Sequence, residues 1–197
     1  MAKNRKRTKI VATLGPACST KEIIEEMMEA GVNVFRVNFS HAEYDDVANK
    51  IKIIRTNSQH LEFKKLVKSL NLDLAGRDGA THLLAEFNDI SNLNYVVLAL
   101  MKSKVIGCGA ISKHNFNSME IKRMYVSPEA RGQRVGDKIL YELENWSKEL
   151  GNSRCVLFMG SKQPEASKLY QRNNYGSTDK YGKLKDIPDS ICLAKDL

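Results

Sequence analysis

The sequence predicts an α/β fold in which a mixed, mostly antiparallel central sheet is flanked by helices and preceded by a shorter strand–helix–strand segment. Apolar runs of strand length alternate with amphipathic helical stretches along the chain. Three of these runs, Tyr95–Met101, Val105–Ser112 and Met119–Val126, are separated by short turns, as antiparallel neighbours usually are. The 197 residues are 42% hydrophobic and 27% charged, which is ordinary for a globular protein with a sizeable core.

The segment before residue 50 predicts a strand, a helix and a second strand. Lys9–Leu14 and Val32–Phe39 are β-branched runs, and a Gly-Pro turn ends the first of them. Between them a Ser-Thr cap precedes an amphipathic helix that stops at Gly31, with apolar residues at Ile23, Ile24, Met27 and Met28. A polar stretch from Glu43 is compatible with a further helix.

A boundary near residue 50 divides the chain into a short N-terminal segment, residues 1–50, and a larger domain, residues 51–197. The run IKIIRTNS at 51–58 reads either as a short strand or as the continuation of the preceding helix. Periodicity alone cannot assign so short an apolar run, so both alternatives stay open at this point.

The larger domain alternates helices and strands to its end. Phe63–Leu72 has helical spacing, a turn is expected at residues 76–79, and Thr81–Phe87 is compatible with a helix. Beyond the three antiparallel runs we expect helices at Gly132–Leu150 and Pro164–Asn173, and strands at Arg154–Met159 and Ser190–Ala194. There is no internal repeat and no low-complexity tract.

Composition excludes several classes of protein. No window approaches the ~18–20 apolar residues of a membrane span, and no apolar signal core follows the basic N-terminus, so we expect a cytoplasmic protein. The net charge of +8 comes without zinc-finger spacing or an aromatic-rich basic stripe, which argues against nucleic-acid binding. The cysteines form no CxxC pair and the histidines stand alone, so no disulfide framework or metal site is predicted; the cysteines are Cys18, Cys108, Cys155 and Cys192.

The run SMEIKRMYVSPEARGQRVGD, residues 118–137, carries the strongest chemical signal. A strand ends at Val126, a turn follows, and Arg131–Gly136 opens a helix. Such a junction directs several main-chain N–H groups at one point, where the helix dipole adds positive potential, so a pyrophosphate fits there. The alternative is an ordinary capped helix, but basic residues in a first turn oppose the dipole and weaken that interpretation.

The strings TKIVATLGPA and NVFRVNFSH make the first quarter of the chain closely similar to the N-terminus of pyruvate kinases. In that family the residues corresponding to Arg36, Asn38, Ser40 and His41 lie near the phosphoenolpyruvate, potassium and nucleotide sites. The rest of the (β/α)₈ barrel, the catalytic lysine and the Mg²⁺-binding carboxylates do not follow. Because two β/α units cannot close a barrel of eight, we expect no pyruvate kinase activity.

Residues 51–197 resemble the GCN5-related N-acetyltransferases, most specifically over residues 119–175. The run from Arg131 to Gly136 resembles their cofactor loop, Gln/Arg-x-x-Gly-x-Gly/Ala, with Arg134 in place of the first Gly. EASKLYQRNNY resembles their Asn-x-x-Ala-x-x-Leu-Tyr-x-x-x-Gly-Phe, with Gln163, Asn174 and Tyr175 at the Asn, Gly and Phe places. The resemblance implies this family's fold, with a first strand at residues 51–58.

The resemblance also implies acetyl-CoA as cosubstrate. Main-chain N–H groups of Gln133–Gly136 would hold the pyrophosphate, and the end of the preceding strand would pair with the pantetheine arm as if with another strand. The cofactor-binding residues expected on this basis are Met124, Tyr125, Val126, Arg131, Gly132, Gln133, Arg134, Val135, Gly136 and Gln163.

Two residues are candidates for the chemistry. Glu120 lies on the strand where several family members carry a base for the acceptor amine; alternatively it only pairs with Lys122 or Arg123, or faces solvent. Tyr170 matches the family tyrosine that protonates the departing thiolate; alternatively it is a half-buried helix aromatic.

The predicted function is an N-acetyltransferase that moves acetyl from acetyl-CoA to a primary amine by direct attack in a ternary complex. The alternative is a non-catalytic CoA-binding or protein-interaction module of the same fold. The acceptor, a small molecule or a peptide, cannot be read from the sequence. Whether the chain forms a homodimer and what the N-terminal segment does also stay open.

Overall fold

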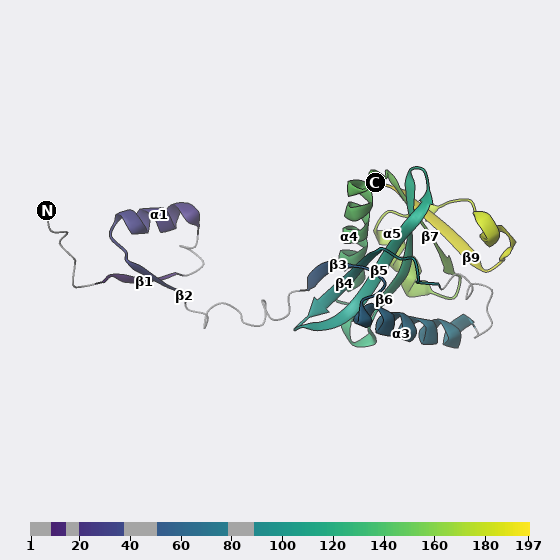
Figure 1. Cartoon of the computed structure of the whole chain (residues 1–197), viewed down its shortest axis with the longest axis horizontal. Helices are drawn as coiled ribbons and strands as arrows, with labels where there is room; N and C mark the ends of the chain where they lie inside the picture. Colours follow the sequence, from purple (N-terminus) through teal and green to yellow (C-terminus); the bar gives the residue numbers. More distant parts are fainter. Residues whose placement is uncertain (1–8, 15–19, 38–50, 79–88) are drawn as a thin grey trace. The chain divides into compact units, whose positions relative to one another are not determined.

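A computed structural model describes residues 9–14, 20–37, 51–78 and 89–197 of the chain (Figure 1). It divides into two compact units, Met1–Lys50 and Ile51–Leu197, and each is considered by itself. The helices expected from Glu43 and over Thr81–Phe87 lie outside the described residues. So do three of the residues expected from the pyruvate kinase resemblance, Asn38, Ser40 and His41.

The first unit is a strand–helix–strand motif, as predicted. Strand β1 (Val11–Leu14) pairs in parallel with β2 (Val34–Val37), and helix α1 (Lys21–Glu29) connects them. The Thr20 side chain accepts a hydrogen bond from the Ile23 N–H at 3.5 Å, which caps the helix. No residue of α1 is buried, and Met28 is 58% exposed.

The second unit is built on one seven-stranded sheet with the order β3-β4-β5-β6-β7-β9-β8. Its strands are β3 (Lys52–Thr56), β4 (Tyr95–Met101), β5 (Lys104–Asn115), β6 (Ser118–Val126), β7 (Arg154–Gly160), β8 (Gly176–Ser177) and β9 (Ser190–Asp196). Only β6 and β7 are parallel neighbours, so the predicted mixed, mostly antiparallel sheet is confirmed. The ambiguous run at 51–58 contains a strand, β3, which is antiparallel to β4.

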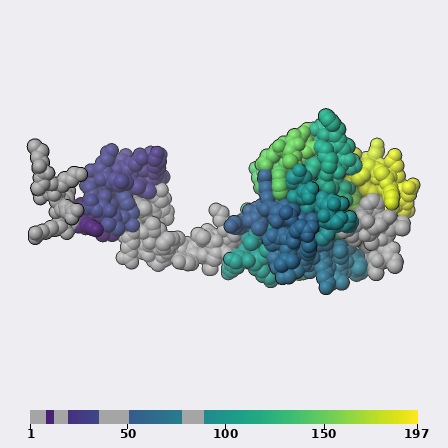
Figure 2. All heavy atoms as spheres, viewed as in Figure 1, coloured from purple at the N-terminus to yellow at the C-terminus, as the bar shows by residue number. Residues whose placement is uncertain are grey.

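Helices cover both faces of this sheet. Helix α3 (Leu61–Asp78) packs over one face through Phe63, whereas α4 (Val135–Glu149) packs over the other through Leu143, and α5 (Pro164–Arg172) joins the α4 side through Tyr170. Figure 2 shows the side chains of residues 51–78 spread over one face of the unit. Two 3₁₀ turns complete the unit, η3 (Pro128–Ala130) and η4 (Gly182–Asp186). None of the helices in the described ranges has the length and apolar character that crossing a bilayer requires.

Several element boundaries differ from the expectation, and two of these differences bear on the site. The prediction of a turn at residues 76–79 is wrong for residues 76–78, because α3 continues to Asp78. There Arg77 is held by Asp73, at 3.3 Å within the helix, and by Glu165 of α5. Helix α4 begins at Val135 rather than at Gly132, because Arg134 adopts a left-handed conformation with φ of 58°.

A bulge in β6 positions the functional part of the fold. The β5–β6 register shifts between Cys108 and Ala110, and Arg123 has a φ of 55°. On its other edge, β6 pairs with β7 only over Ser118–Glu120, so the strands part beyond Glu120. The last residues of β6 therefore have an edge that β7 does not cover.

Candidate active site

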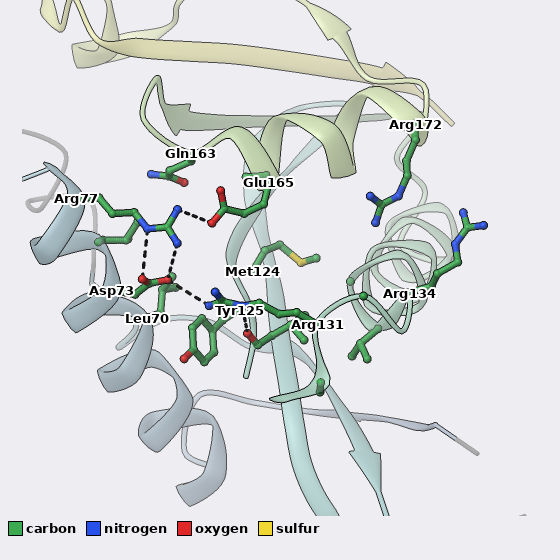
Figure 3. Close-up of a pocket in the computed structure, with 17 residues that line it drawn as sticks. Leu70, Asp73, Arg77, Met124, Tyr125, Arg131, Arg134, Gln163, Glu165 and Arg172 are labelled. Atoms are coloured by element: carbon green, nitrogen blue, oxygen red, sulfur yellow. Dashed lines mark hydrogen bonds and ion pairs between the residues drawn. The ribbon is translucent and has the colours of Figure 1, made fainter. Parts of the chain in front are cut away.

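A cavity of about 480 Å³ opens beside the end of β6, where β6 and β7 have separated (Figure 3). Its walls come from α3, the end of β6, the turn into α4 and the helix α5. The lining residues are Leu70, Asp73, Leu74, Arg77, Met124, Tyr125, Val126, Ala130, Arg131, Gly132, Arg134, Val135, Gly136, Gln163, Glu165, Ala166 and Arg172. With four arginines and two carboxylates in its lining, the cavity favours an anionic ligand.

The N-terminus of α4 contributes main-chain donors to this cavity. Arg134 is the N-cap, and its side chain makes no capping hydrogen bond. Within the described part of the chain, no acceptor is found for the N–H groups of Gly132 and of residues 134–136. Unpaired N–H groups and the positive end of the helix dipole therefore meet at one place, an arrangement that binds phosphates.

Arg131 connects three parts of the cavity wall. Its Nε donates to the Val126 carbonyl oxygen at 3.0 Å, and its Nη2 lies 3.3 Å from Asp73 Oδ2 on α3. Its guanidinium also lies over the Tyr125 ring, 5.8 Å from the ring centre. Arg131 thus ties the end of β6 to α3.

Arg77 makes a second connection, between α3 and α5. Its Nε lies 3.3 Å from Asp73 Oδ1, and its Nη1 pairs with Glu165 Oε1 (Figure 3). The hydrogen bond that Arg77 donates to Glu165 raises the pKa of Arg77 above its ordinary value. Asp73 and Glu165 therefore largely neutralise Arg77 and Arg131.

A separate charged group surrounds Asp137, in the first turn of α4. Arg172 forms a two-pronged ion pair with it, at 2.7 and 2.6 Å, and Arg134 Nη2 lies 3.5 Å from Asp137 Oδ1. The Asn173 side-chain amide donates to the same carboxylate at 2.9 Å. Hydrogen bonds from Arg172 above all hold the pKa of Asp137 well below its usual range.

The structure brings together nearly all of the residues predicted to bind the cofactor. Every one of them lines the cavity except Gln133, whose side-chain amide instead donates to the Glu129 carbonyl at 3.5 Å. That they bind acetyl-CoA stays a prediction. The sequence reasoning did not find the contributions of α3, such as Asp73 and Arg77, because no motif marks them. Arg172 lies within EASKLYQRNNY and could have been noticed as a cation in the last turn of a helix that carries a motif.

Glu120 lies outside the cavity lining. It is buried at the point where β6 and β7 part, and its Oε2 lies 3.0 Å from Lys122 Nζ. The Tyr181 hydroxyl donates to its Oε1 at 2.8 Å, and the Tyr181 ring packs edge-on against His114. Pairing with Lys122, one of the alternatives for this residue, is therefore present.

Tyr170 also lies outside the lining, on the inner side of α5. Its ring is 6% exposed and packs edge-on against Tyr175, with 5.5 Å between ring centres. Burial raises the pKa of Tyr170 above its ordinary value. The aromatic is thus more deeply buried than the half-buried alternative expected.

No metal or disulfide chemistry is found in the parts of the chain that the structure describes. No group of three or more His, Cys, Asp or Glu side chains in these ranges has the geometry of a metal site. Cys108, Cys155 and Cys192 are free and buried, and burial raises the pKa of Cys108 to about 12 and that of Cys155 to about 11. These thiols are therefore poor nucleophiles at neutral pH.

The N-terminal part of the chain is similar to pyruvate kinases. The family model "Pyruvate kinase, barrel domain" matches residues 5–122. The chain is 52% identical over 54 residues to the pyruvate kinase of Methylorubrum extorquens and 42% identical over 77 residues to that of Staphylococcus aureus, which is 27% and 39% of this chain. It spans only 11% and 13% of the length of those two relatives. Barrel strands are all parallel, whereas among the described residues of this match only β1 and β2 pair that way.

The second unit is similar to acetyltransferases. The family model "Acetyltransferase (GNAT) domain" matches residues 92–176. A Klebsiella pneumoniae structure assigned as an acyl-CoA N-acyltransferase is 26% identical, with a TM-score of 0.64 over 75% of this chain and 97% of that one. A GNAT family acetyltransferase from Elizabethkingia anophelis with acetyl-CoA bound is 21% identical, with a TM-score of 0.56 over 75% and 98%. The PaiA N-acetyltransferase of Thermoplasma acidophilum in complex with coenzyme A is 18% identical, with a TM-score of 0.57 over 75% and 99%.

Proposed function

Because the chain belongs to the acetyltransferase (GNAT) family in its larger unit and to the pyruvate kinase family in its N-terminal part, we propose that it is an N-acetyltransferase. It moves an acetyl group from acetyl-CoA to a primary amine by direct attack. The barrel residues that pyruvate kinase chemistry requires do not follow the N-terminal part. A cytoplasmic location and assembly as a homodimer stay predictions.

The observation that carries this proposal is the anion-binding cavity at the start of α4. The N–H groups of Gly132 and of residues 134–136 have no acceptor among the described residues, and these residues line a cavity with more arginines than carboxylates. These groups fit a pyrophosphate. The pantetheine arm then follows Met124–Val126, along the edge of β6 that β7 leaves free. The Val126 carbonyl accepts a hydrogen bond from Arg131 Nε at 3.0 Å, and its second lone pair can still accept from a ligand.

Acetyl-CoA supplies an activated thioester, in which a C–N bond to the amine forms as the C–S bond breaks. Glu120 accepts the proton that the attacking amine must lose, directly or through a water. Tyr170 donates a proton to the departing thiolate. The raised pKa keeps the Tyr170 phenol protonated at neutral pH, so the donor is always in its acid form. The same raised pKa makes proton transfer from the phenol to the CoA thiolate less favourable, because the ordinary pKa of the thiol is only about 8.5.

The test of turnover is a panel of amines with acetyl-CoA, read by release of free thiol. The described cysteines are buried and contribute little background, whereas Cys18 lies outside the described residues and is replaced by Ser beforehand. Release of thiol with at least one amine supports the proposal. Failure of CoA to bind in calorimetry contradicts it.

The role of Tyr170 is tested by Tyr170→Phe. We expect kcat to fall about 100-fold with the dissociation constant for CoA unchanged, because the change removes only the proton donor. Tyr175→Phe is the matched control, since it removes a buried hydroxyl from the other ring of the same aromatic pair, and we expect it to keep kcat. If Tyr170→Phe keeps the kcat of the wild type, Tyr170 is not the acid.

A second candidate is a CoA-binding module without turnover. One observation favours it: Glu120 and Tyr170 both lie outside the cavity lining, and Glu120 already has Lys122 and Tyr181 as partners. Under this alternative, calorimetry shows CoA binding as it does under the first proposal, but no amine in the panel leads to release of free thiol from acetyl-CoA.

A further inference from the structure

Two arginines from different helices stand at the α4 end of the cavity, Arg134 at the N-cap of α4 and Arg172 in the last turn of α5. They share a single carboxylate, Asp137, at 3.5 and 2.6 Å. Figure 3 shows both side chains near the start of α4, apart from the group formed by Arg77, Asp73 and Glu165.

The positive charge of the cavity is concentrated at this end. Arg77 and Arg131 have Asp73 and Glu165 as partners within the lining itself. At the α4 end, two guanidinium groups face one carboxylate, and the helix dipole adds further positive potential. Asp137 compensates one of these two positive charges, and the other remains beside the positive end of the helix, so this end of the cavity favours a ligand with negative charge.

The geometry holds Arg172 in place while leaving part of it free. Asp137 is 12% exposed and binds Arg172 through both of its carboxylate oxygens, which fixes the orientation of the guanidinium. The Arg172 side chain is still 45% exposed and that of Arg134 is 73% exposed. N–H groups on both therefore remain available to a ligand, and arginine suits the geometry of phosphate.

We propose that Arg172, together with Arg134, binds the 3′-phosphate of coenzyme A. This inference rests on the proposed function, in which the main-chain N–H groups of residues 132–136 take the pyrophosphate. A second phosphate group is then left for the neighbouring arginines. A phosphate monoester carries a charge between −1.5 and −2 near neutral pH, so it is attracted by the uncompensated positive charge of these arginines.

The experiment compares two ligands that differ only in the 3′-phosphate. The dissociation constants of CoA and of dephospho-CoA are measured by calorimetry on the full chain, for the wild type and for Arg172→Met. We expect the wild type to bind CoA about tenfold or more tightly than dephospho-CoA, the usual worth of a charge-assisted contact. In Arg172→Met this ratio falls toward one, because affinity for CoA drops while affinity for dephospho-CoA stays.

Arg154→Met is the matched control. Arg154 is 41% exposed and pairs with Asp196 at 2.6 Å, much as Arg172 pairs with Asp137, but it does not line the cavity. The wild-type ratio should persist in this variant, although it loses the same charge. Arg172→Lys keeps the charge without the planar fork and should give an intermediate ratio.

A purely structural role for Arg172 gives a different result. Loss of a helix-to-helix ion pair alone weakens both ligands equally, so an unchanged ratio in folded Arg172→Met overturns the inference and leaves the proposed function standing. If the wild type binds neither ligand, the proposed function itself fails. If Arg172→Met does not fold, the two dissociation constants are measured for Arg134→Gly instead. Glycine readily adopts the left-handed conformation at that position, so this variant should fold. An unchanged ratio of the two dissociation constants in Arg134→Gly then overturns the inference.

Discussion

Arg134 and Asp137 lie within one turn of each other at the start of α4, and each has an uncommon feature. Arg134 takes a φ of 58°, a conformation that costs a non-glycine residue about 1 kcal/mol or more. The family motif has Gly at this place, so the chain accepts backbone strain there and gains a guanidinium beside the cavity. Asp137 is mostly buried, and it is held as an anion by Arg172, in the last turn of α5, and by Asn173, which follows that helix.

At the residue scale we predict that Asp137→Asn destabilises the protein by about 1 to 2 kcal/mol at pH 7 and by less in acid. Arg172 lowers the pKa of Asp137 below its usual value of 3.8, so the ion pair contributes fully above that pH. As the pH falls below about 4 the unfolded chain takes up the proton first, and the contribution is lost. Urea unfolding at pH 7 and at pH 3 measures both differences.

Asp196→Asn is the control for this prediction. Asp196 pairs with Arg154 at 2.6 Å but is 80% exposed, so its loss should cost less than about 1 kcal/mol at either pH. A difference between Asp137→Asn and the wild type that stays constant from pH 7 to pH 3 would show that the ionised carboxylate is not what stabilises this helix contact.

At the scale of elements, the close packing of α4 on β5 and β6 holds the site together. A Cβ added to Gly109 of β5 would lie 2.5 Å from Met124 Sδ and 2.8 Å from Ile139 Cγ2. The side chain of Met124, beside the bulge in β6, therefore occupies the space that Gly109 leaves free. Gly76 in α3 is the opposite case, since a Cβ there would meet no heavy atom within 4 Å.

We therefore predict opposite effects for the same substitution at these two glycines. Gly109→Ala should lower the free energy of unfolding by about 1 to 3 kcal/mol and weaken CoA binding, because Met124 must move. Gly76→Ala should raise it by about 0.5 to 1 kcal/mol, because alanine favours the helix. Denaturant titration of both variants measures the difference, and equal effects at the two sites would contradict the packing described for Met124.

At the scale of the whole molecule, the two units differ in how much they bury. The first unit has a two-stranded parallel sheet and a helix without buried residues, and Val11 and Met28 are more than half exposed. A two-stranded sheet is marginally stable by itself. The second unit has the seven-stranded sheet with buried clusters on both faces.

We predict that residues 51–197 fold alone as an independent domain. This fragment should unfold cooperatively at the midpoint of the full chain and bind CoA with the same affinity, because all of the cavity residues belong to it. The fragment of residues 1–50 should show no cooperative transition. Circular dichroism melting of both fragments is the measurement. A fragment 51–197 without a cooperative transition would mean that the N-terminal segment stabilises the rest of the chain.

Local features of this protein could be read from the sequence alone. The strand ending at Val126, the turn and the helix start near Val135 form one contiguous run of the sequence. The directions of its main-chain N–H groups are set by the backbone angles of the same residues and their neighbours. For this reason the cavity-lining residues from Met124 to Gly136 were predicted except for Ala130, whereas Gln133 was predicted and does not line the cavity. The same locality explains the N-terminal strand–helix–strand motif.

Other features were decided only by the tertiary structure. Asp73 and Arg77 reach the cavity because α3 packs beside the end of β6, and Arg172 meets Asp137 because α5 ends at the start of α4. Glu120 has its partner Tyr181 61 residues away. An ion pair or hydrogen bond between distant segments requires elements to be docked at a particular distance and angle. The spacing of residues in the sequence does not specify the distance and angle at which two elements dock, whereas a main-chain turn is determined by the residues that form it.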